Sequence, residues 1–95
     1  MDFDSFKRST DNEQPPDGLS LALQALWWDA RGEWAKAHDL AQQQDDANGA
    51  WVHGYLHREE GDDANAGYWY RRAGKTPGAG ALVAEWAAIA RALLA

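Results

Sequence analysis

Two histidines and a glutamate in the middle of the chain have the residue types and spacing of metal ligands. His53 and His57 are four residues apart, and Glu60 follows three residues later. On a helix this spacing places all three side chains on one face, and imidazole and carboxylate groups together bind divalent transition metals. The pattern is not the metalloprotease signature H-E-x-x-H, because Gly54 replaces the catalytic glutamate. Two interpretations stay open: a metal site, or histidines that border an aromatic core and bond to neighbours.

A third histidine, His38, belongs to the inner stripe of a helix expected from about Glu33 to Gln43. A single histidine there is typical of a packing residue rather than a catalytic base. A base would also need a nucleophile, but the hydroxyl residues fall in the N-terminal segment, in loops or at a helix start, outside any nucleophile elbow. We therefore expect no enzyme and no cofactor, and keep an enzyme built on His53 and His57 as the alternative.

Arginines and aromatic residues concentrate in the third quarter of the chain. Arg71 and Arg72 end an expected helix that also carries Tyr68 and Trp69. Cations at the C-terminus of a helix favourably meet its negative dipole end, which accounts for the arginines without a ligand. The same arginines can donate hydrogen bonds to a carboxylate or phosphate, and the neighbouring aromatic rings can stack on a ligand. The candidate binding residues are Trp51, Tyr55, Arg58, Tyr68, Trp69, Arg71 and Arg72.

Charge and composition exclude several classes of function. The 95 residues carry a net charge of −6 and include no cysteine. Phosphate backbones and anionic membranes repel an acidic chain, so we expect neither nucleic acid nor a membrane as partner. The lack of cysteine excludes disulfides, zinc–thiolate sites and thiol nucleophiles. No apolar run approaches the about 20 residues of a membrane span, and the first residues lack a signal-peptide core, so we expect a cytoplasmic protein.

The chain divides into an expected tail and one helical domain. Residues 1–18 are polar, acidic and rich in turn formers, which predicts a flexible, disordered N-terminal tail. Over residues 19–95, apolar residues recur at helical spacing and predict a single all-α domain of about five helices. We expect an antiparallel helical hairpin over 19–44, a second over 47–74, and a capping helix over 80–94. Gly32 and Gly61 separate the helices within the hairpins.

A glycine-anchored pattern occurs twice, 29 residues apart, and it carries a family resemblance. The segment that starts at Gly32-Glu33 aligns with the segment that starts at Gly61-Asp62. The second copy has the tetratricopeptide spacing G-x6-G-D-x3-A-x3-[FY]-x2-A, at Gly54, Gly61, Asp62, Ala66, Tyr70 and Ala73. Residues 65–73 also look like the A-x-x-W-Y-x-K-A stretch of Sel-one-like repeats. Over about residues 21–78 the chain therefore resembles this helical-repeat superfamily, which implies a scaffold that binds peptides or proteins in a concave groove.

Three functional hypotheses follow from these patterns. The first is a small, non-enzymatic helical-repeat module that binds a protein or peptide, acidic ones included. The second is a divalent-metal-binding protein or enzyme that uses the helix face of His53 and His57. The third is a homo-oligomeric structural protein, such as a homodimer, that buries an exposed aromatic face against its own copy.

Overall fold

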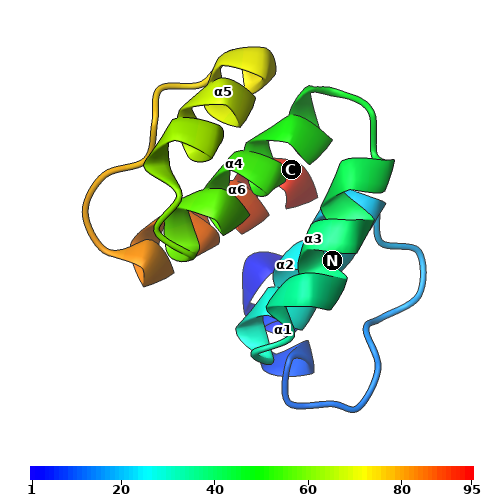
Figure 1. The fold of residues 1–95 in the computed structure, drawn as a ribbon. Coiled ribbons are helices and arrows are strands. Elements are labelled where there is room, and N and C mark those ends of the chain that lie inside the picture. The colour runs from blue at the N-terminus through cyan, green and yellow to red at the C-terminus, as the bar shows by residue number, and fades with distance from the viewer.

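The computed structural model describes residues 1–95 and contains six α-helices and no strand (Figure 1). The helices are α1 (Phe3–Ser9), α2 (Leu21–Ala30), α3 (Trp34–Gln43), α4 (Ala47–Glu59), α5 (Asp63–Ala73) and α6 (Leu82–Leu94). The all-α class is confirmed. The expected number of about five helices is wrong by one, because the N-terminal segment contributes α1.

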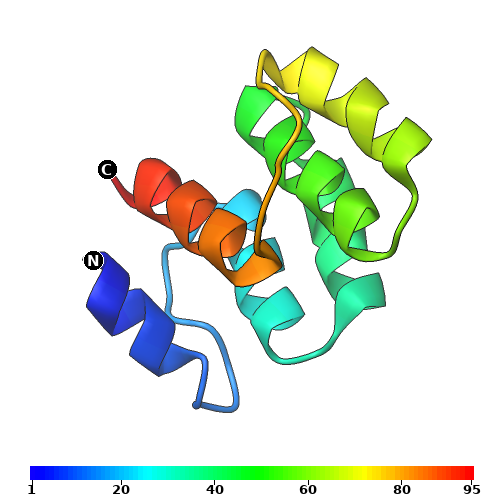
Figure 2. The ribbon, with the colours of Figure 1, turned by 90° about the vertical axis from the view of Figure 1, so that its left-hand side faces the viewer.

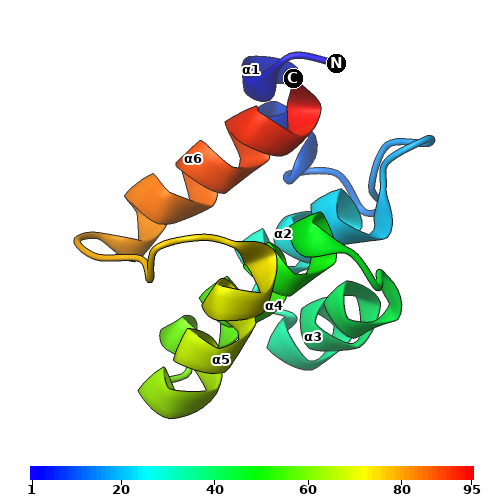
Figure 3. The same cartoon turned by 90° about the horizontal axis from the view of Figure 1, so that it is seen from above.

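The disordered tail expected over residues 1–18 is also wrong. Asp2 caps α1 by accepting a hydrogen bond from the Ser5 N–H. Phe6 is fully buried and stacks on Trp86 of α6, with the ring centroids 5.7 Å apart. Figures 2 and 3 show α1 beside the C-terminal half of α6, so the two ends of the chain are close together. Composition concealed this helix because a few specific contacts dock it: the Asp2 cap, the burial of Phe6, and the hydrogen bond from Trp27 Nε1 to Ser9 Oγ at 3.1 Å.

The turn between α2 and α3 and the turn between α4 and α5 have the same backbone conformation. Gly32 joins α2 to α3 and Gly61 joins α4 to α5, with positive φ angles of 81° and 88°. Glycine adopts this conformation without the steric penalty of a side chain. The equivalent hydrogen bonds are Gly32 N–H to Asp29 O and Glu33 N–H to Trp28 O in one turn, and Gly61 N–H to Arg58 O and Asp62 N–H to His57 O in the other. Each acceptor in the second turn is 29 residues beyond its counterpart.

The helices on either side of each turn pack closely on each other. Contacts between helices are most extensive for α4 with α5 and for α2 with α3. Small buried residues permit this approach: a Cβ atom on Gly54 would lie 3.2 Å from the Tyr70 backbone nitrogen. Ala37 and Ala66, again 29 residues apart, are both buried. The close approach fixes which faces of α3, α4 and α5 meet.

Helix α6 lies across α2 and α4, the first helix of each pair, and also contacts α1 (Figure 3). Trp86 of α6 is anchored by the hydrogen bond from its Nε1 to the Leu26 carbonyl, 2.9 Å. Glu85 accepts hydrogen bonds from Arg58 at 2.7 Å and from Tyr70 at 2.6 Å, which tie α6 to α4 and α5. None of the six helices has the length and apolar character that crossing a membrane requires.

Candidate metal-binding site

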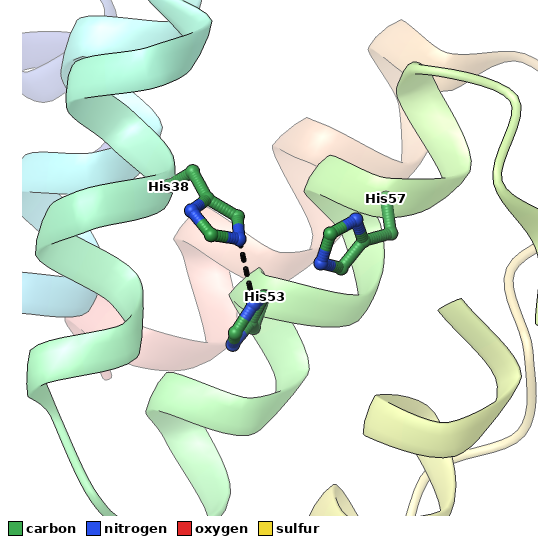
Figure 4. Close-up of side chains that lie close together, drawn as sticks. All are labelled: His38, His53 and His57. Atoms are coloured by element: carbon green, nitrogen blue, oxygen red, sulfur yellow. Dashed lines mark hydrogen bonds between the residues drawn. The ribbon is translucent and has the colours of Figure 1, made fainter. Parts of the chain in front are cut away.

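Three histidines meet where α3 packs against α4. His38 comes from α3, and His53 and His57 come from successive turns of α4 (Figure 4). One ring nitrogen from each lies within 4.8 Å of those of the other two. The Nε2 atoms of His38 and His53 are only 3.0 Å apart. The chain has three histidines in total, so all of them belong to this cluster.

Local features of α3 and α4 explain why the histidines converge. Asp46 caps the start of α4 by accepting a hydrogen bond from the Gly49 N–H at 2.9 Å. On the facing helix, Trp34 donates from Nε1 to the Leu56 carbonyl at 2.8 Å, which fixes α3 against α4. His38 is one turn beyond Trp34 and therefore reaches the same interface.

Two tryptophans, one on α3 and one on α5, flank the histidine cluster. Trp34 stacks on His38 with the rings 5.0 Å apart and 19° from parallel. Trp69 of α5 stacks on His53 at 4.0 Å and 18°. Consequently His53 and His57 are buried, with 4% and 5% of their surface exposed. Stacking on flat rings restricts how far the imidazoles can turn, so the cluster is held before any ligand arrives.

The outer contacts of His57 involve both of its ring nitrogens. Nδ1 lies 2.7 Å from a Glu60 carboxylate oxygen. Nε2 lies 3.3 Å from the side-chain nitrogen of Asn65 on α5. A carboxylate and an amide N–H suit one tautomer, in which Nδ1–H donates to Glu60 and Nε2 accepts from Asn65. The unprotonated nitrogen is then Nε2, which points toward the other two rings (Figure 4) and whose lone pair is engaged by Asn65.

Burial and crowding favour the neutral forms of His38 and His53. Burial, reinforced by neighbouring His38 and His57, lowers the pKa of His53 from 6.5 to about 4. The pKa of His38 is also lowered, chiefly by burial, although Glu60 and Asp39 oppose the shift. Loss of hydration disfavours a charged imidazolium, and a second cation nearby disfavours it further.

The structure brings only two of the three metal ligands inferred from sequence into the main cluster. His53 and His57 lie together, as their four-residue spacing predicts. Glu60 lies behind His57 and forms a separate group with His57 and Asp62. The third nitrogen of the main cluster comes from His38, which sequence reasoning treated as a packing residue. No local spacing could reveal it, because its approach to His53 depends on how α3 crosses α4.

The candidate binding residues are divided between two sides of the molecule. Tyr55 is buried, with its hydroxyl 3.4 Å from the Leu82 carbonyl, and Arg58 pairs with Glu85. Both therefore anchor α6 and are not free to meet a partner. Arg71 is exposed on the surface of α5.

The remaining candidates lie nearer the histidine cluster. Tyr68 is 45% exposed, and the Arg72 guanidinium lies over the rings of Tyr68 and Trp69 at 5.8 and 5.2 Å. Trp51 has the Lys75 ammonium 4.2 Å from its ring centre. Their aromatic faces are therefore already occupied in part by cations of the chain itself.

Comparison with known proteins adds no assignment to this geometry. No family model matches the chain. No curated protein and no solved structure matches it either. Its function has to be argued from the chemistry of the site.

Proposed function

We propose that this protein binds a divalent transition-metal ion through His38, His53 and His57. The observation that carries the proposal is the convergence of three imidazoles from two helices, with ring nitrogens within 4.8 Å of one another. Imidazole is a favoured ligand of zinc, copper and nickel ions. Three histidines also leave one position of a tetrahedral ion open to water.

The spacing of the nitrogens fits a small ion with little rearrangement. Zinc–nitrogen bonds of about 2.0–2.1 Å in a tetrahedron place ligand nitrogens about 3.3 Å apart. His38 and His53 are already at 3.0 Å, and they would separate slightly as the ion replaces their hydrogen bond. The third nitrogen has to approach by less than about 1.5 Å, which rotation of one ring can supply.

Charge and outer contacts also support binding. A metal competes with protons for imidazole nitrogens, and the pKa of His53 at about 4 removes that competition near neutrality. Glu60 on Nδ1 of His57 is the carboxylate–histidine contact that commonly orients metal ligands. Asn65 has to release Nε2 of His57, because an amide N–H and a metal cannot share one lone pair.

Zinc titration of the purified, metal-free protein by calorimetry tests this proposal. We expect one ion per chain, and loss of that site in His38→Gln. Glu60→Gln keeps the hydrogen bond but removes the charge, so it should weaken binding by about tenfold. Asp39→Asn, beside His38 on the exposed face, removes an equal charge that contacts no imidazole nitrogen and should weaken binding less than Glu60→Gln does.

Two results would count against the three-histidine site. Absence of saturable zinc, nickel or cobalt binding by folded protein overturns it outright. Normal binding by His38→Gln together with loss in Glu60→Gln would assign the metal to His53, His57 and Glu60 instead. Circular dichroism of each variant separates lost binding from lost folding.

We further propose that α2–α5 form two tetratricopeptide- or Sel-one-like helical hairpins. The equivalent hydrogen bonds at the Gly32 and Gly61 turns support this, as does the close approach of α5 at Gly54. In such an architecture the first helix of each hairpin lines the concave side. Helix α6 lies against α2 and α4, and would therefore occupy the groove that these repeats offer to peptides.

A second candidate function is binding of an acidic peptide by the outer face of α5. The observation that favours it is the exposed pair of Tyr68 and Arg72 beside Trp69. Arginine forks bind carboxylates, and the neighbouring rings provide stacking surface. Titration with a tetra-glutamate peptide, followed by tryptophan fluorescence, tests this function. Saturable binding that is lost in Arg72→Ala would support it. If the peptide causes no change in tryptophan emission, the function is contradicted.

A further inference from the structure

An asparagine of α5 contacts the histidine cluster beside the position where the ion would bind. The side-chain nitrogen of Asn65 lies 3.3 Å from Nε2 of His57, the ring nitrogen that points toward the other two imidazoles (Figure 4). Glu60 contacts Nδ1, the other nitrogen of the same ring, so its carboxylate lies behind the ring. The protein therefore places an amide, rather than a carboxylate, next to the proposed metal position.

The packing of α5 on α4 fixes Asn65 at this place. Asn65 and Trp69 are four residues apart and share one face of α5. Asn65 meets His57, and one turn away Trp69 stacks on His53 with the rings 4.0 Å apart. The two helices approach closely here, since a Cβ atom on Gly54 would lie 3.3 Å from a backbone oxygen of α5. Two matched contacts between closely packed helices keep Asn65 beside the cluster.

The distance between Asn65 and His57 is close to that of two ligand atoms on one tetrahedral ion. Bonds of about 2.1 Å from a metal to nitrogen and oxygen place neighbouring ligand atoms about 3.4 Å apart. The side-chain nitrogen of Asn65 and Nε2 of His57 are already 3.3 Å apart. The ion has to lie beside the line that joins them, which a small rotation of the Asn65 side chain permits. The fourth corner of the tetrahedron therefore has a protein side chain next to it.

A half-turn of the Asn65 amide exchanges a hydrogen-bond donor for a metal ligand. The side-chain oxygen has lone pairs, whereas the NH₂ group offers only N–H donors. Rotation about χ2 exchanges the two groups, and this torsion has a broad, roughly two-fold preference. The oxygen accepts no hydrogen bond from the protein, so the rotation breaks only the contact with His57, which metal binding has to break in any case. Asn65 is partly exposed, so its NH₂ group can then reach water.

We propose that the side-chain oxygen of Asn65 is the fourth ligand of the ion, an assignment that rests on the proposed three-histidine site. In the metal-free protein the amide of Asn65 holds Nε2 of His57, and in the loaded protein its oxygen bonds to the ion. Zinc sites with four protein ligands are structural, whereas catalytic sites keep one position for water or substrate. The ion then joins α3, α4 and α5, and leaves no position for a substrate.

Azide added to the cobalt-loaded protein tests whether the protein fills all four positions. The visible absorption of Co²⁺ depends on the number and type of its ligands, and azide binds where protein groups leave a position free. We expect azide to leave the spectrum of the unmodified protein unchanged. In Asn65→Ala it should replace the water at the vacant position and change the spectrum. Asn48→Ala, at an exposed position in the first turn of α4, is the matched control and should behave like the unmodified protein.

Cobalt affinity provides a second readout, whose direction separates a ligand from a competitor. Loss of a ligand in Asn65→Ala should weaken binding by at least about tenfold, the lower end of the effect of removing an outer contact. If Asn65 only competed with the ion for Nε2 of His57, the same variant would bind cobalt more tightly. Asn65→Asp keeps an oxygen at this position and should restore the affinity that Asn65→Ala loses. The double variant Ala64→Asp/Asn65→Ala has the same charge at the neighbouring exposed position and should not restore it.

Two results would overturn Asn65 as a ligand. One is an azide response of the unmodified protein equal to that of Asn65→Ala, and the other is cobalt affinity in Asn65→Ala that equals or exceeds that of the unmodified protein. If cobalt binding is nevertheless lost in His38→Gln, the three-histidine site stands without a fourth protein ligand. If the unmodified protein binds no cobalt, the site and its fourth ligand are both contradicted. Circular dichroism checks that each variant is folded.

Discussion

The Nε2 atoms of His38 and His53 face each other at 3.0 Å across the interface of α3 and α4. A hydrogen bond between these two nitrogens needs one that carries a proton and one that does not, so the ring that accepts is neutral. A proton added to the accepting Nε2 would place two donors in opposition in a buried, aromatic setting. The contact therefore ties the stability of the interface to pH, and a metal ion that binds both nitrogens has to replace it.

Acid should destabilise the metal-free protein through His53. Its pKa is about 4 in the fold, against 6.5 ordinarily. Between these values the unfolded chain binds a proton that the folded chain does not, so stability falls as pH drops from 6.5 to 4. The loss is on the order of 2–3 kcal/mol. Urea unfolding of the protein and of His53→Phe across this range checks it, since the variant should show a smaller loss; parallel curves would contradict the account.

Glu59 should have the opposite pH dependence. Burial and the adjacent Asp29 raise the pKa of Glu59 from 4.5 to about 8, so the folded protein keeps a proton that the unfolded chain releases. Stability then decreases as pH rises from 4.5 to 8. Glu59→Gln stays neutral, so its stability relative to the unmodified protein should improve by on the order of 2 kcal/mol across this window. A difference that stays constant with pH, as expected for Asp39→Asn, would be evidence against the buried pair.

Two helix-interior glycines should respond in opposite directions to the same substitution. A Cβ on Gly54 would lie 3.2 Å from the Tyr70 nitrogen and 3.3 Å from the Ala66 carbonyl oxygen, both backbone atoms. Gly54→Ala should therefore cost about 1–3 kcal/mol of stability. A Cβ on Gly67 would meet only the Arg71 guanidinium at 3.4 Å, which can move. Gly67→Ala should stabilise the protein by up to about 1 kcal/mol through helix propensity. Chemical denaturation measures both, and stabilisation by Gly54→Ala would refute the close approach.

Helix α1 should be an integral part of the folded protein. Phe6 is fully buried against Trp86, so Phe6→Ala should cost about 3 kcal/mol. Phe3 is half-buried beneath the Arg91 guanidinium, 4.2 Å from its ring centre, and serves as the matched control with a smaller loss. Thermal or urea unfolding gives both values. A loss below about 0.5 kcal/mol in Phe6→Ala would mean that α1 contributes no core.

Sequence reasoning succeeded where the determining contacts are local. Helical spacing located α2 to α6 to within a few residues. The shared face of His53 and His57 also follows from a four-residue interval. These features depend on a single helix and its ends, so one stretch of sequence contains the information.

Features that depend on how helices cross could not be predicted in this way. His38 meets His53 because the Trp34–Leu56 hydrogen bond fixes α3 on α4. Asp29 and Glu59 meet because two helices end side by side, although each alone looks like an ordinary surface acid. Helix α1 was not predicted because the segment is acidic and polar. Its two phenylalanines stabilise the helix only through contact with Trp86, which is about eighty residues away in the sequence.

The most direct test of the proposed function is a histidine-selective nitrogen NMR spectrum during addition of zinc. At one equivalent, we predict that a ring-nitrogen resonance of His38 shifts together with those of His53 and His57, and that further zinc causes no change. If zinc leaves the His38 resonance in place, or if none of the three shifts at stoichiometric metal, the three-histidine site is contradicted.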